Sequence, residues 1–335
     1  MLRIGIAGYG KIGQIREAAI NKLNSAEVVA IYDVNMPGTV NGNIVVCASY
    51  EELLEQNLDA IFVCAFNNVL AEYTILALNR GIHVFCEKPP ARNTSELITV
   101  IETEKNTSQI LKYGFNHRYH YSVMEAKKLI ESGIMGKLLW MRGVYGKAGS
   151  IDYHKNWRNY RKISGGGILI DQGIHMLDLM MYFSNSTFEK INSFVTTAYW
   201  DIEAEDNAFV IMQNADKVTA MLHSSATQWR HKFLLELTFE EGYINLDGIL
   251  SATRSYAPEK MVVGRREFED ITHAMGKPNE SITWFEYDDS WDFEVREFID
   301  SINGDFTIQN GTSEDAYNAL KLVEDIYEYS GFYND

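Results

Sequence analysis

The stretch Gly8-Tyr9-Gly10-Lys11-Ile12-Gly13 decides the fold of the first part of this chain. It follows the apolar run Ile4–Ala7, precedes a segment with helical periodicity, and lies twenty residues before Asp33, the end of a second apolar run. Glycines at these three positions permit a tight turn, close approach of a ligand to the backbone, and close packing of the helix on the strand. The N–H groups at the start of such a helix attract phosphate. We interpret the stretch as a dinucleotide-binding turn rather than an ordinary strand–turn–helix connection, with contacts from Gly8, Gly10, Lys11, Ile12 and Gly13.

Asp33 bears on the choice of nucleotide. A carboxylate at this position accepts hydrogen bonds from the ribose hydroxyls of NAD and repels the 2′-phosphate of NADP. No lysine or arginine occurs from Val34 to Tyr50 to neutralise such a phosphate. We therefore expect NAD rather than NADP.

Length, charge and cysteine usage restrict the class of protein. The 335 residues exceed the roughly 250–300 at which a single core stops growing, so we expect two domains. A net charge of −16 disfavours nucleic acid and anionic lipid as partners. Three irregularly spaced cysteines indicate small buried side chains rather than disulfides. With no signal-peptide pattern and no apolar run of the roughly 20 residues that span a bilayer, we expect a cytoplasmic protein.

The first part of the chain alternates strands and helices, which is typical of a parallel sheet with right-handed crossovers. We assign residues 1–119 to this nucleotide-binding domain. The expected strands are Arg3–Ala7, Val28–Tyr32, Ile44–Cys47, Ala60–Cys64, His83–Phe85 and Ile110–Tyr113. The expected helices are Ile12–Leu23, Tyr50–Gln56, Ala71–Asn79 and Ser95–Lys105, the last with Thr94 or Ser95 as N-cap.

Residues 120–335 have a different pattern, with longer strands and fewer helices, which predicts an α+β domain. The expected strands are Leu138–Tyr145, Ile191–Trp200, Ala208–Met212, Val218–Ser224, Phe233–Phe239 and Tyr243–Leu246. The expected helices are Tyr121–Glu131, Gly167–Phe183, Asp292–Ile302 and Glu314–Tyr329. Helices would cover one face of this sheet. The other face needs a partner, so we expect a homo-oligomer, a dimer or a tetramer.

Ligands of an open parallel sheet bind beyond the carboxyl ends of its strands. Asn67 follows the fourth strand, Glu87 and Lys88 follow the fifth, and Arg118 follows the sixth. A lysine directly after a buried strand can polarise a substrate oxygen and stabilise negative charge on it. Glu87 can be its partner. The alternative for Lys88 is a solvated loop lysine.

A second group of polar residues follows Gly165-Gly166-Gly167. Asp171 and His175 are four residues apart on a strongly apolar helix and share a face, with Asp178 near it. An imidazole there can take a hydroxyl proton while a nicotinamide takes the hydride from the same carbon. Asp171 can orient the ring or bind a substrate hydroxyl. The alternative is a satisfied core histidine with a capping aspartate; no cysteine cluster or second spaced histidine indicates a metal.

Trp157 and Arg158 lie just upstream, in a loop rich in polar and aromatic residues. An indole can stack on the apolar face of a sugar ring, and a guanidinium can bind a phosphate or carboxylate. The same composition also suits an ordinary packing or interface loop.

Together these motifs resemble the Gfo/Idh/MocA family, the glucose–fructose oxidoreductase and inositol dehydrogenase group. The matching elements are Gly8-x-Gly10-x-x-Gly13, Glu87-Lys88-Pro89 and Gly165-Gly166-Gly167 leading to Asp171-x-x-x-His175. The segment Ala65–Leu70 departs from the family pattern, with Phe66 where many members have proline and Leu70 where they have histidine. Because of this departure, the family's contacts in the pocket near the nicotinamide ribose do not transfer directly to this segment.

The resemblance implies an N-terminal Rossmann domain and a C-terminal α+β domain with a large, mostly antiparallel open sheet that forms the oligomer contact. It also implies oxidation or reduction of a secondary hydroxyl or ketone of a sugar, sugar nucleotide or cyclitol. The family's catalytic triad maps onto Lys88, Asp171 and His175, with the histidine as acid/base. Two other functions remain open at this point: an NAD-binding regulator without catalysis, and a hydrolase or lyase that oxidises its substrate transiently.

Overall fold

The structure is a computed structural model that describes residues 1–35, 43–268, 272–274, 276 and 278–333. Part of the interval between Val34 and Tyr50 therefore lies outside the described residues. The chain divides into two compact units. The first comprises Met1–Asn116, Lys162–Gly165 and Asp289–Lys321; the second comprises His117–Arg161, Gly166–Asp288 and Leu322–Asp335. Each unit is described by itself.

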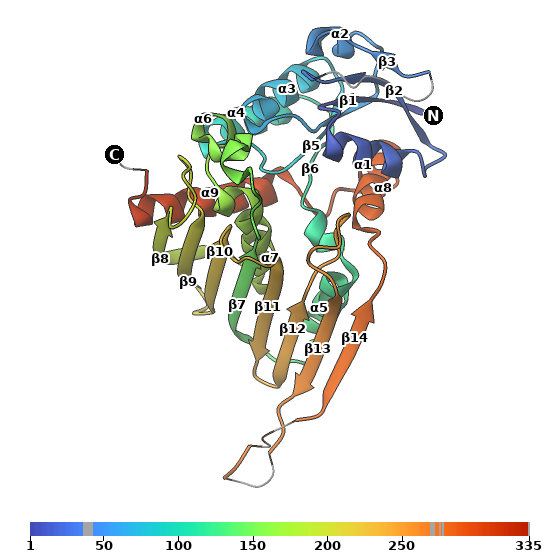
Figure 1. The fold of residues 1–335 in the computed structure, drawn as a ribbon. Helices are drawn as coiled ribbons and strands as arrows, with labels where there is room; N and C mark the ends of the chain where they lie inside the picture. Colours follow the sequence, from blue (N-terminus) through green and yellow to red (C-terminus); the bar gives the residue numbers. More distant parts are fainter. Residues whose placement is uncertain (36–42, 269–271, 275, 277, 334–335) are drawn as a thin grey trace. The chain divides into compact units, whose positions relative to one another are not determined.

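The first unit contains a six-stranded parallel sheet in the order β3-β2-β1-β4-β5-β6 (Figure 1). The order reverses between β1 and β4, which makes their carboxyl ends the topological switch point where such sheets bind ligands. Its strands are β1 (Leu2–Ala7), β2 (Ala26–Tyr32), β3 (Val45–Val46), β4 (Ala60–Val63), β5 (His83–Cys86) and β6 (Leu111–Tyr113). Its helices are α1 (Lys11–Ile20), α2 (Tyr50–Leu54), α3 (Asn67–Asn79), α4 (Thr94–Lys105) and α8 (Ser290–Ile302), with the start of α9 (Ser313–Ser330).

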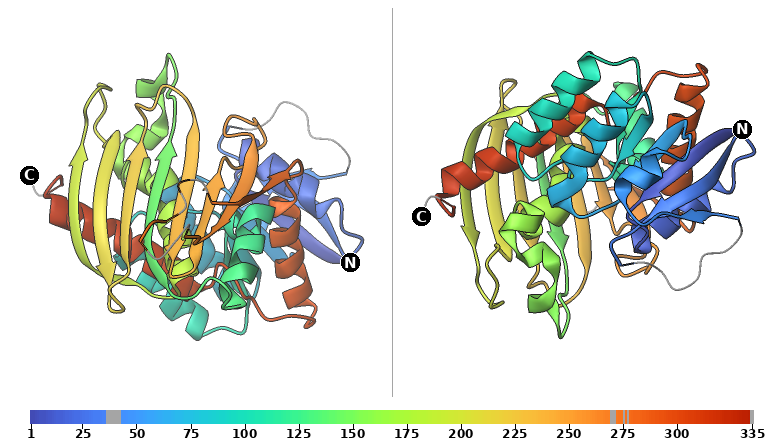
Figure 2. Two further views of the ribbon diagram at one scale, coloured as in Figure 1. Left: turned by 90° about the horizontal axis from the view of Figure 1, so that it is seen from below. Right: turned by 90° about the horizontal axis from the view of Figure 1, so that it is seen from above.

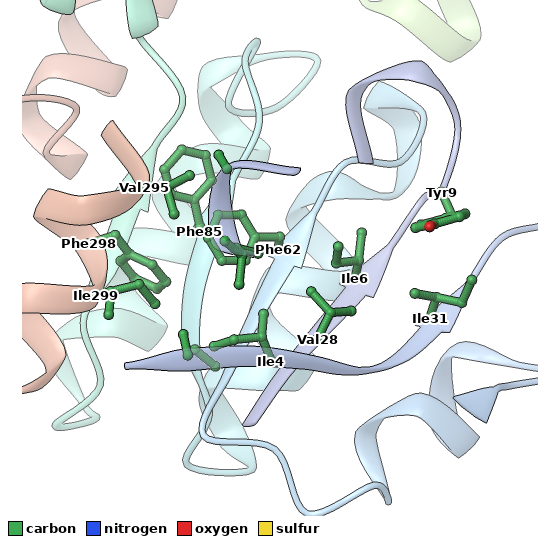
Figure 3. Packing of buried hydrophobic residues seen from close by; sticks show 14 residues of the cluster. Ile4, Ile6, Tyr9, Val28, Ile31, Phe62, Phe85, Val295, Phe298 and Ile299 are labelled. Carbon is green, nitrogen blue, oxygen red and sulfur yellow. The ribbon is translucent and has the colours of Figure 1, made fainter. Parts of the chain in front are cut away.

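The core of the first unit joins the sheet to a helix from far along the chain. Phe62 on β4 and Phe85 on β5 stack with ring centroids 4.8 Å apart, and Phe298 of α8 meets both rings edge-on (Figure 3). Ile4 and Ile6 of β1 belong to the same fully buried cluster. Because burying one such side chain contributes roughly 1.5–3 kcal/mol, α8 is integral to this unit.

Because of this packing, the observed division of the chain into two units differs from the division predicted at residue 120. The sequence assigned all of 120–335 to the second domain, whereas Asp289–Lys321 lies in the first unit. The physical reason is the apolar face of α8, on which Val295, Phe298 and Ile299 are completely buried against the nucleotide-binding sheet.

The second unit contains an eight-stranded sheet in the order β14-β13-β12-β11-β7-β10-β9-β8 (Figure 1). Two further views of its strands are given in Figure 2. Its pairings are antiparallel except for the parallel pair β7 and β10. The strands are β7 (Leu138–Gly146), β8 (Phe188–Thr196), β9 (Asn207–Asn214), β10 (Thr219–Ser225), β11 (Lys232–Phe239), β12 (Gly242–Asp247), β13 (Glu259–Arg265) and β14 (Glu280–Phe285). The predicted fold class, a Rossmann sheet followed by a mostly antiparallel open sheet, is confirmed.

Helices cover one face of this sheet. α7 (Ile174–Ser184) contacts β7 and β10, α5 (Tyr121–Glu131) contacts β12 and β13, and the end of α9 reaches β8 through the Ser193 hydroxyl, which donates to the Ile326 carbonyl at 2.8 Å. The strands alternate accordingly: Ala208, Val210 and Met212 of β9 are buried, while Phe209 and Ile211 between them are about half exposed. The second face of the sheet is therefore partly apolar.

Two local expectations are wrong, and the strands β13 and β14 lie where the sequence indicates none. The N-cap of α4 is Asn93, whose side-chain oxygen accepts the Glu96 N–H at 2.9 Å, rather than Thr94 or Ser95. The expected helix from Gly167 to Phe183 consists of a π-helical turn, η4 (Leu169–Gly173), followed by α7.

Candidate active site

The glycines of the nucleotide-binding turn have the expected tasks. Gly8 has a φ of 91°, and a Cβ there would lie 2.4 Å from the Cys64 carbonyl oxygen. A Cβ on Gly13 would lie 2.2 Å from the Gly8 carbonyl oxygen, so this glycine allows helix α1 to pack closely on the turn. A Cβ on Gly10 would meet nothing within 4 Å. The backbone at Gly10 is thus open to a ligand, directly before the first residue of α1.

Asp33 lies beside this turn. Its Oδ2 accepts the Tyr9 N–H at 2.6 Å and its Oδ1 accepts the Asn35 N–H at 2.7 Å. The two amide bonds fix the carboxylate at the end of β2 and next to the glycine turn. An open glycine, a helix N-terminus and an adjacent fixed acid are the features that hold the pyrophosphate and ribose of a dinucleotide, so the residues present fit NAD(P).

Glu87 belongs to a buried charge cluster. Arg16 of α1, which is completely buried, donates from Nε to Glu87 Oε1 at 2.7 Å, and its Nη1 lies 2.7 Å from Glu294 Oε2 of α8. The Arg16 guanidinium also lies between the rings of Phe85 and Trp291, 4.3 and 4.4 Å from their centroids. A single arginine therefore connects the helix after the glycine turn, the Glu87–Lys88 segment and α8.

Electrostatics in this cluster follow from burial. Burial raises the pKa of the Glu294 carboxyl to about 7, although Arg16 and Lys112 act in the opposite direction. For Arg16, burial disfavours the charged form, but the carboxylates of Glu87 and Glu294 hold its pKa above the ordinary value. A Cβ on Gly114 would lie 2.9 Å from Glu87 Oε2, so this glycine makes room for the cluster.

Lys88 and Asn67 follow neighbouring strands of the same unit. Lys88 is half-buried and comes two residues after the end of β5. Asn67 is the first residue of α3, and its side-chain amide donates to the Ser164 carbonyl at 2.8 Å. Both residues lie at the carboxyl edge of the sheet, in the positions that the sequence predicts.

In the second unit, Asp171 is a nearly buried carboxylate with two cations. Its Oδ1 accepts from Arg158 Nε at 3.1 Å, and its Oδ2 accepts from Lys147 Nζ at 3.0 Å. It lies in the π-helical turn η4, where the Ile174 N–H donates to the Leu169 carbonyl five residues earlier. Such turns in helices often coincide with functional sites.

His175 stands at the beginning of α7, four residues after Asp171, and is buried. Its ring stacks on the ring of His117, with centroids 3.8 Å apart and planes 16° apart. His117 Nε2 lies 2.9 Å from the Tyr145 hydroxyl, and burial raises the pKa of this phenol well above its usual value. The phenol stays neutral at ordinary pH, so it can donate to His117 or accept from it.

Arg118 was predicted to bind substrate; in the structure it pairs with Asp178. Its Nε and Nη2 lie 2.9 and 2.6 Å from the two carboxylate oxygens of Asp178, and both residues are buried. Its guanidinium also lies 4.7 Å from the centroid of the Tyr182 ring. This bidentate pair joins the short 3₁₀ helix η1 (Asn116–Tyr119) to α7.

The glycines before the helix are packing residues. A Cβ on Gly165 would lie 2.5 Å from the Arg92 carbonyl oxygen, and a Cβ on Gly167 would lie 2.1 Å from the Glu205 carbonyl oxygen. Glu205 in turn accepts the N–H groups of Gly167 and Leu169 at 2.7 and 2.9 Å. The start of the helix is therefore held by a buried carboxylate.

The sequence interpretation missed Arg16, Lys147 and the contact of His117 with His175. Arg16 carried a signal, because it takes a core position of α1 at helical spacing from Gly13 and Ile20. Lys147 directly follows β7, the same kind of position that drew attention to Lys88. Within the described residues, no group of three or more His, Cys, Asp or Glu side chains is placed to hold a metal ion. No helix in the described part of the chain is long and apolar enough to span a bilayer.

A Rossmann sheet with a glycine turn that fits a dinucleotide, followed by a large open sheet, defines a two-domain nicotinamide-dependent oxidoreductase. Comparison with protein families agrees. Residues 2–115 match the oxidoreductase family with an NAD-binding Rossmann fold, and residues 123–245 match the GFO/IDH/MocA C-terminal domain. The chain belongs to the Gfo/Idh/MocA family.

Individual relatives extend this similarity to most of the chain. The inositol 2-dehydrogenase of Salmonella typhimurium is 25% identical over 96% of this chain and 92% of its own length. The glucose-6-phosphate 3-dehydrogenase of Bacillus subtilis is 31% identical over 56% of this chain and 55% of its own length. A solved structure of levoglucosan dehydrogenase with NADH superimposes with a TM-score of 0.84 at 19% identity, covering 98% of this chain and 97% of that one.

Proposed function

We propose that the protein is an NAD-dependent dehydrogenase or ketoreductase acting on a secondary hydroxyl or ketone of a sugar, sugar nucleotide or cyclitol. The observation that carries the proposal is His175, a buried imidazole held against His117 and four residues from an ion-paired aspartate. Relatives named as inositol and glucose-6-phosphate dehydrogenases support the substrate class.

The roles follow from the chemistry of each side chain. His175 accepts the hydroxyl proton during oxidation and returns it during reduction. Lys88 places positive charge beside the reacting oxygen, and Asp171 positions the substrate or the imidazole. The nicotinamide, when bound, accepts or supplies the hydride. Lys88 belongs to the first unit (1–119 in the predicted division) and His175 to the second (120–335). We assign cofactor binding to the first unit and substrate binding to the second.

Cofactor contacts are proposed for the glycine turn, Asp33, Asn67, Glu87 and Lys88, with NAD preferred over NADP. The support for this preference is the Asp33 carboxylate, which Tyr9 and Asn35 hold in place at the turn. A fixed carboxylate cannot withdraw from a 2′-phosphate. Asp33→Ala should therefore raise kcat/KM with NADP relative to NAD.

A test of the function measures NADH formation across a panel of sugars, sugar phosphates, sugar nucleotides and cyclitols. Lys88→Met and His175→Asn should each lower kcat by at least about a hundredfold on the active substrate, the usual contribution of a general acid or base. His175→Asn should bind NAD normally by calorimetry, whereas Lys88→Met, which also removes a proposed cofactor contact, should bind it more weakly. Lys155→Met and His154→Asn change exposed side chains of the same types and serve as controls.

Each other outcome has a distinct meaning. Full turnover in both variants contradicts the assigned roles. NAD binding without any turnover of the panel supports a regulator, and bond cleavage without NADH accumulation supports a hydrolase or lyase that oxidises its substrate transiently.

The uncovered face of the eight-stranded sheet supports a homo-oligomer. Phe194, Phe209 and Trp284 on this face are 76%, 47% and 57% exposed, and Met221 and Ile282 add further apolar surface. A second copy of this chain presents the same apolar face, so the two faces can pack against each other in a symmetric dimer. Light scattering should give a dimer or tetramer, and Phe209→Glu should lower the measured mass; a monomeric wild type would contradict the proposal.

A further inference from the structure

A buried carboxylate holds the start of the segment that carries Asp171 and His175. Glu205 is completely buried, and its two oxygens accept the N–H groups of Gly167 and Leu169 at 2.7 and 2.9 Å. Amides at the start of a helix have no carbonyl partner within the helix, so they need an acceptor from elsewhere. Because one side chain satisfies two of these amides, the segment begins at a fixed place.

Two tyrosines from the C-terminal end of the described chain bind the same carboxylate. The Tyr327 hydroxyl donates to Glu205 Oε1 at 2.7 Å, and the Tyr333 hydroxyl donates to Oε2 at 2.6 Å. Each carboxylate oxygen therefore accepts one amide and one phenol. Burial raises the pKa of both phenols well above the usual value, so both hydroxyls keep their protons and act as donors. We call Glu205, Tyr327 and Tyr333 the carboxylate clamp.

The glycines before the helix make room for this clamp. A Cβ on Gly166 would lie 2.2 Å from the Tyr327 hydroxyl oxygen, and a Cβ on Gly167 would lie 2.1 Å from the Glu205 carbonyl oxygen. The Ile168 N–H donates to that same carbonyl at 3.1 Å. A side chain at either glycine would push the clamp away from the start of the helix. The second and third glycines of the motif are therefore required by the contact with the clamp.

The C-terminal end of the chain reaches Glu205 through a turn after α9. The helix ends at Ser330, and Gly331 has a φ of 67°, a conformation that glycine adopts without strain. The Tyr333 ring then packs against the Tyr327 ring with centroids 4.8 Å apart, and the Arg161 guanidinium lies 3.7 Å from the Tyr333 ring centroid. Contacts to the ring and the hydrogen bond of the hydroxyl thus place Tyr333 together.

The π-helical turn connects the clamp to Asp171. The turn begins at Leu169, directly at the clamp, and the Asp171 N–H donates to the Gly167 carbonyl at 3.0 Å. The clamp therefore holds the residue that receives the bond from Asp171. His175 lies beyond the turn in α7, where it is buried and stacked on His117. The direction of the Asp171 side chain relative to His175 consequently depends on where the turn begins.

We propose that Glu205, Tyr327 and Tyr333 are positioning residues, which fix the start of η4 and thereby set the Asp171 carboxylate relative to the His175 imidazole. This role rests on the proposed function, in which Asp171 and His175 act on the substrate. It makes the C-terminal end of the chain part of the catalytic machinery, because the two tyrosines act through Asp171.

Tyr333→Phe tests this role, because it removes one hydrogen bond to Glu205 and keeps the ring contacts. On the active substrate of the panel, kcat should fall about tenfold, since small displacements of catalytic groups slow a reaction strongly, and KM for NAD should change less than about twofold. Tyr327→Phe, which removes the donor at the other oxygen, should act in the same direction. Tyr329→Phe alters a tyrosine that is 62% exposed and should change neither constant. Circular dichroism confirms that each variant is folded.

A double-mutant cycle separates positioning from a general loss of stability. In the Asp171→Asn background, Tyr333→Phe should lower kcat less than about twofold, because the carboxylate that it positions is already gone. A variant that merely lost stability would lower the active fraction equally in both backgrounds. Assays well below the unfolding midpoint of each variant keep this comparison clean.

Hydrogen exchange gives a readout independent of turnover. The amides of residues 167–175 should exchange at least about tenfold faster in Tyr333→Phe than in the wild type, with unchanged exchange in the six-stranded sheet of the first unit. Unchanged kcat in Tyr333→Phe, or a fall of equal size in the Asp171→Asn background, overturns this inference and leaves the proposed function standing. Absence of NADH with every substrate of the panel, while exchange at 167–175 still depends on Tyr333, overturns the proposed function instead.

Discussion

The charge clusters around Arg16 in the first unit and around Asp171 in the second are built in opposite ways. In the first, one cation lies between two carboxylates and two aromatic rings, and none of the Arg16 side chain is exposed. In the second, one carboxylate lies between two cations, of which Arg158 rests on a single ring and is 37% exposed. A buried cluster that encloses its cation holds elements together. A half-open cluster with an excess of charge has capacity for a ligand.

The largest expected effect tests the structural character of the first cluster. Arg16→Met would leave Glu87 and Glu294 buried without their cation, and loss of one partner of a buried ion pair costs about 3–5 kcal/mol. Chemical denaturation should show this loss in the free energy of unfolding. A loss below 1 kcal/mol would mean that the cluster does not hold the first unit together.

Glu294 gives the first cluster a pH dependence. Its folded-state pKa of about 7 lies above the ordinary value of 4.5, so the native state binds the proton more tightly than the unfolded chain. Binding of this proton stabilises the native state fully below pH 4.5, and the stabilisation is lost as the pH rises through 7. A pKa shift of this size corresponds to on the order of 3 kcal/mol in the free energy of unfolding. Glu294→Gln should flatten this decline between pH 5 and pH 8 in urea denaturation. Parallel curves for wild type and variant would contradict the prediction.

Asp171→Asn applies the corresponding change to the second cluster. The two cations lose their shared anion but regain water because both are partly exposed, so we expect a loss of only about 1 kcal/mol in stability. Turnover should fall much further than stability. A stability loss as large as that of Arg16→Met would make this cluster structural and remove the contrast.

Arg158→Gln should have the smallest effect on stability, within about 0.5 kcal/mol, because partly exposed ion pairs contribute little. Thermal unfolding of this variant beside Lys155→Gln should give similar midpoints. The expected separation between the two variants lies in turnover, because Arg158 donates to Asp171. A large drop in the midpoint for Arg158→Gln would indicate that Trp157 and Arg158 serve mainly to pack the loop.

The sequence predicts the nucleotide-binding sheet well because its signals are local. Gly8, Gly10 and Gly13 each have a steric task that only glycine performs, and the strands around them are continuous apolar runs. β14 carries no such signal: five of its six residues are exposed and it is an edge strand paired only with β13, so no alternation of buried and exposed residues identifies it.

The candidate site was predictable in part for the same reason. Lys88, Asp171 and His175 occur in motifs with fixed spacing, whereas the partners Arg16 and Lys147 lie 71 and 24 residues from the groups they contact. Pairings over such distances depend on how elements pack, as the assignment of α8 to the first unit also does. Local patterns in one chain do not contain that information.

The π-helical turn at Leu169–Gly173, directly before α7, holds about one residue more than an ordinary helical turn. Loss of one codon between 171 and 175 would leave a continuous ordinary helix, because the π turn absorbs one extra residue without changing the rotation of the flanking residues. The two residues would then be three positions apart in the chain, roughly 60° apart around the helix axis instead of nearly in line. The carboxylate at 171 and the imidazole at 175 would then face different directions on an intact scaffold. Short deletions at this turn are thus a route by which a descendant of this chain could keep its fold and lose its chemistry.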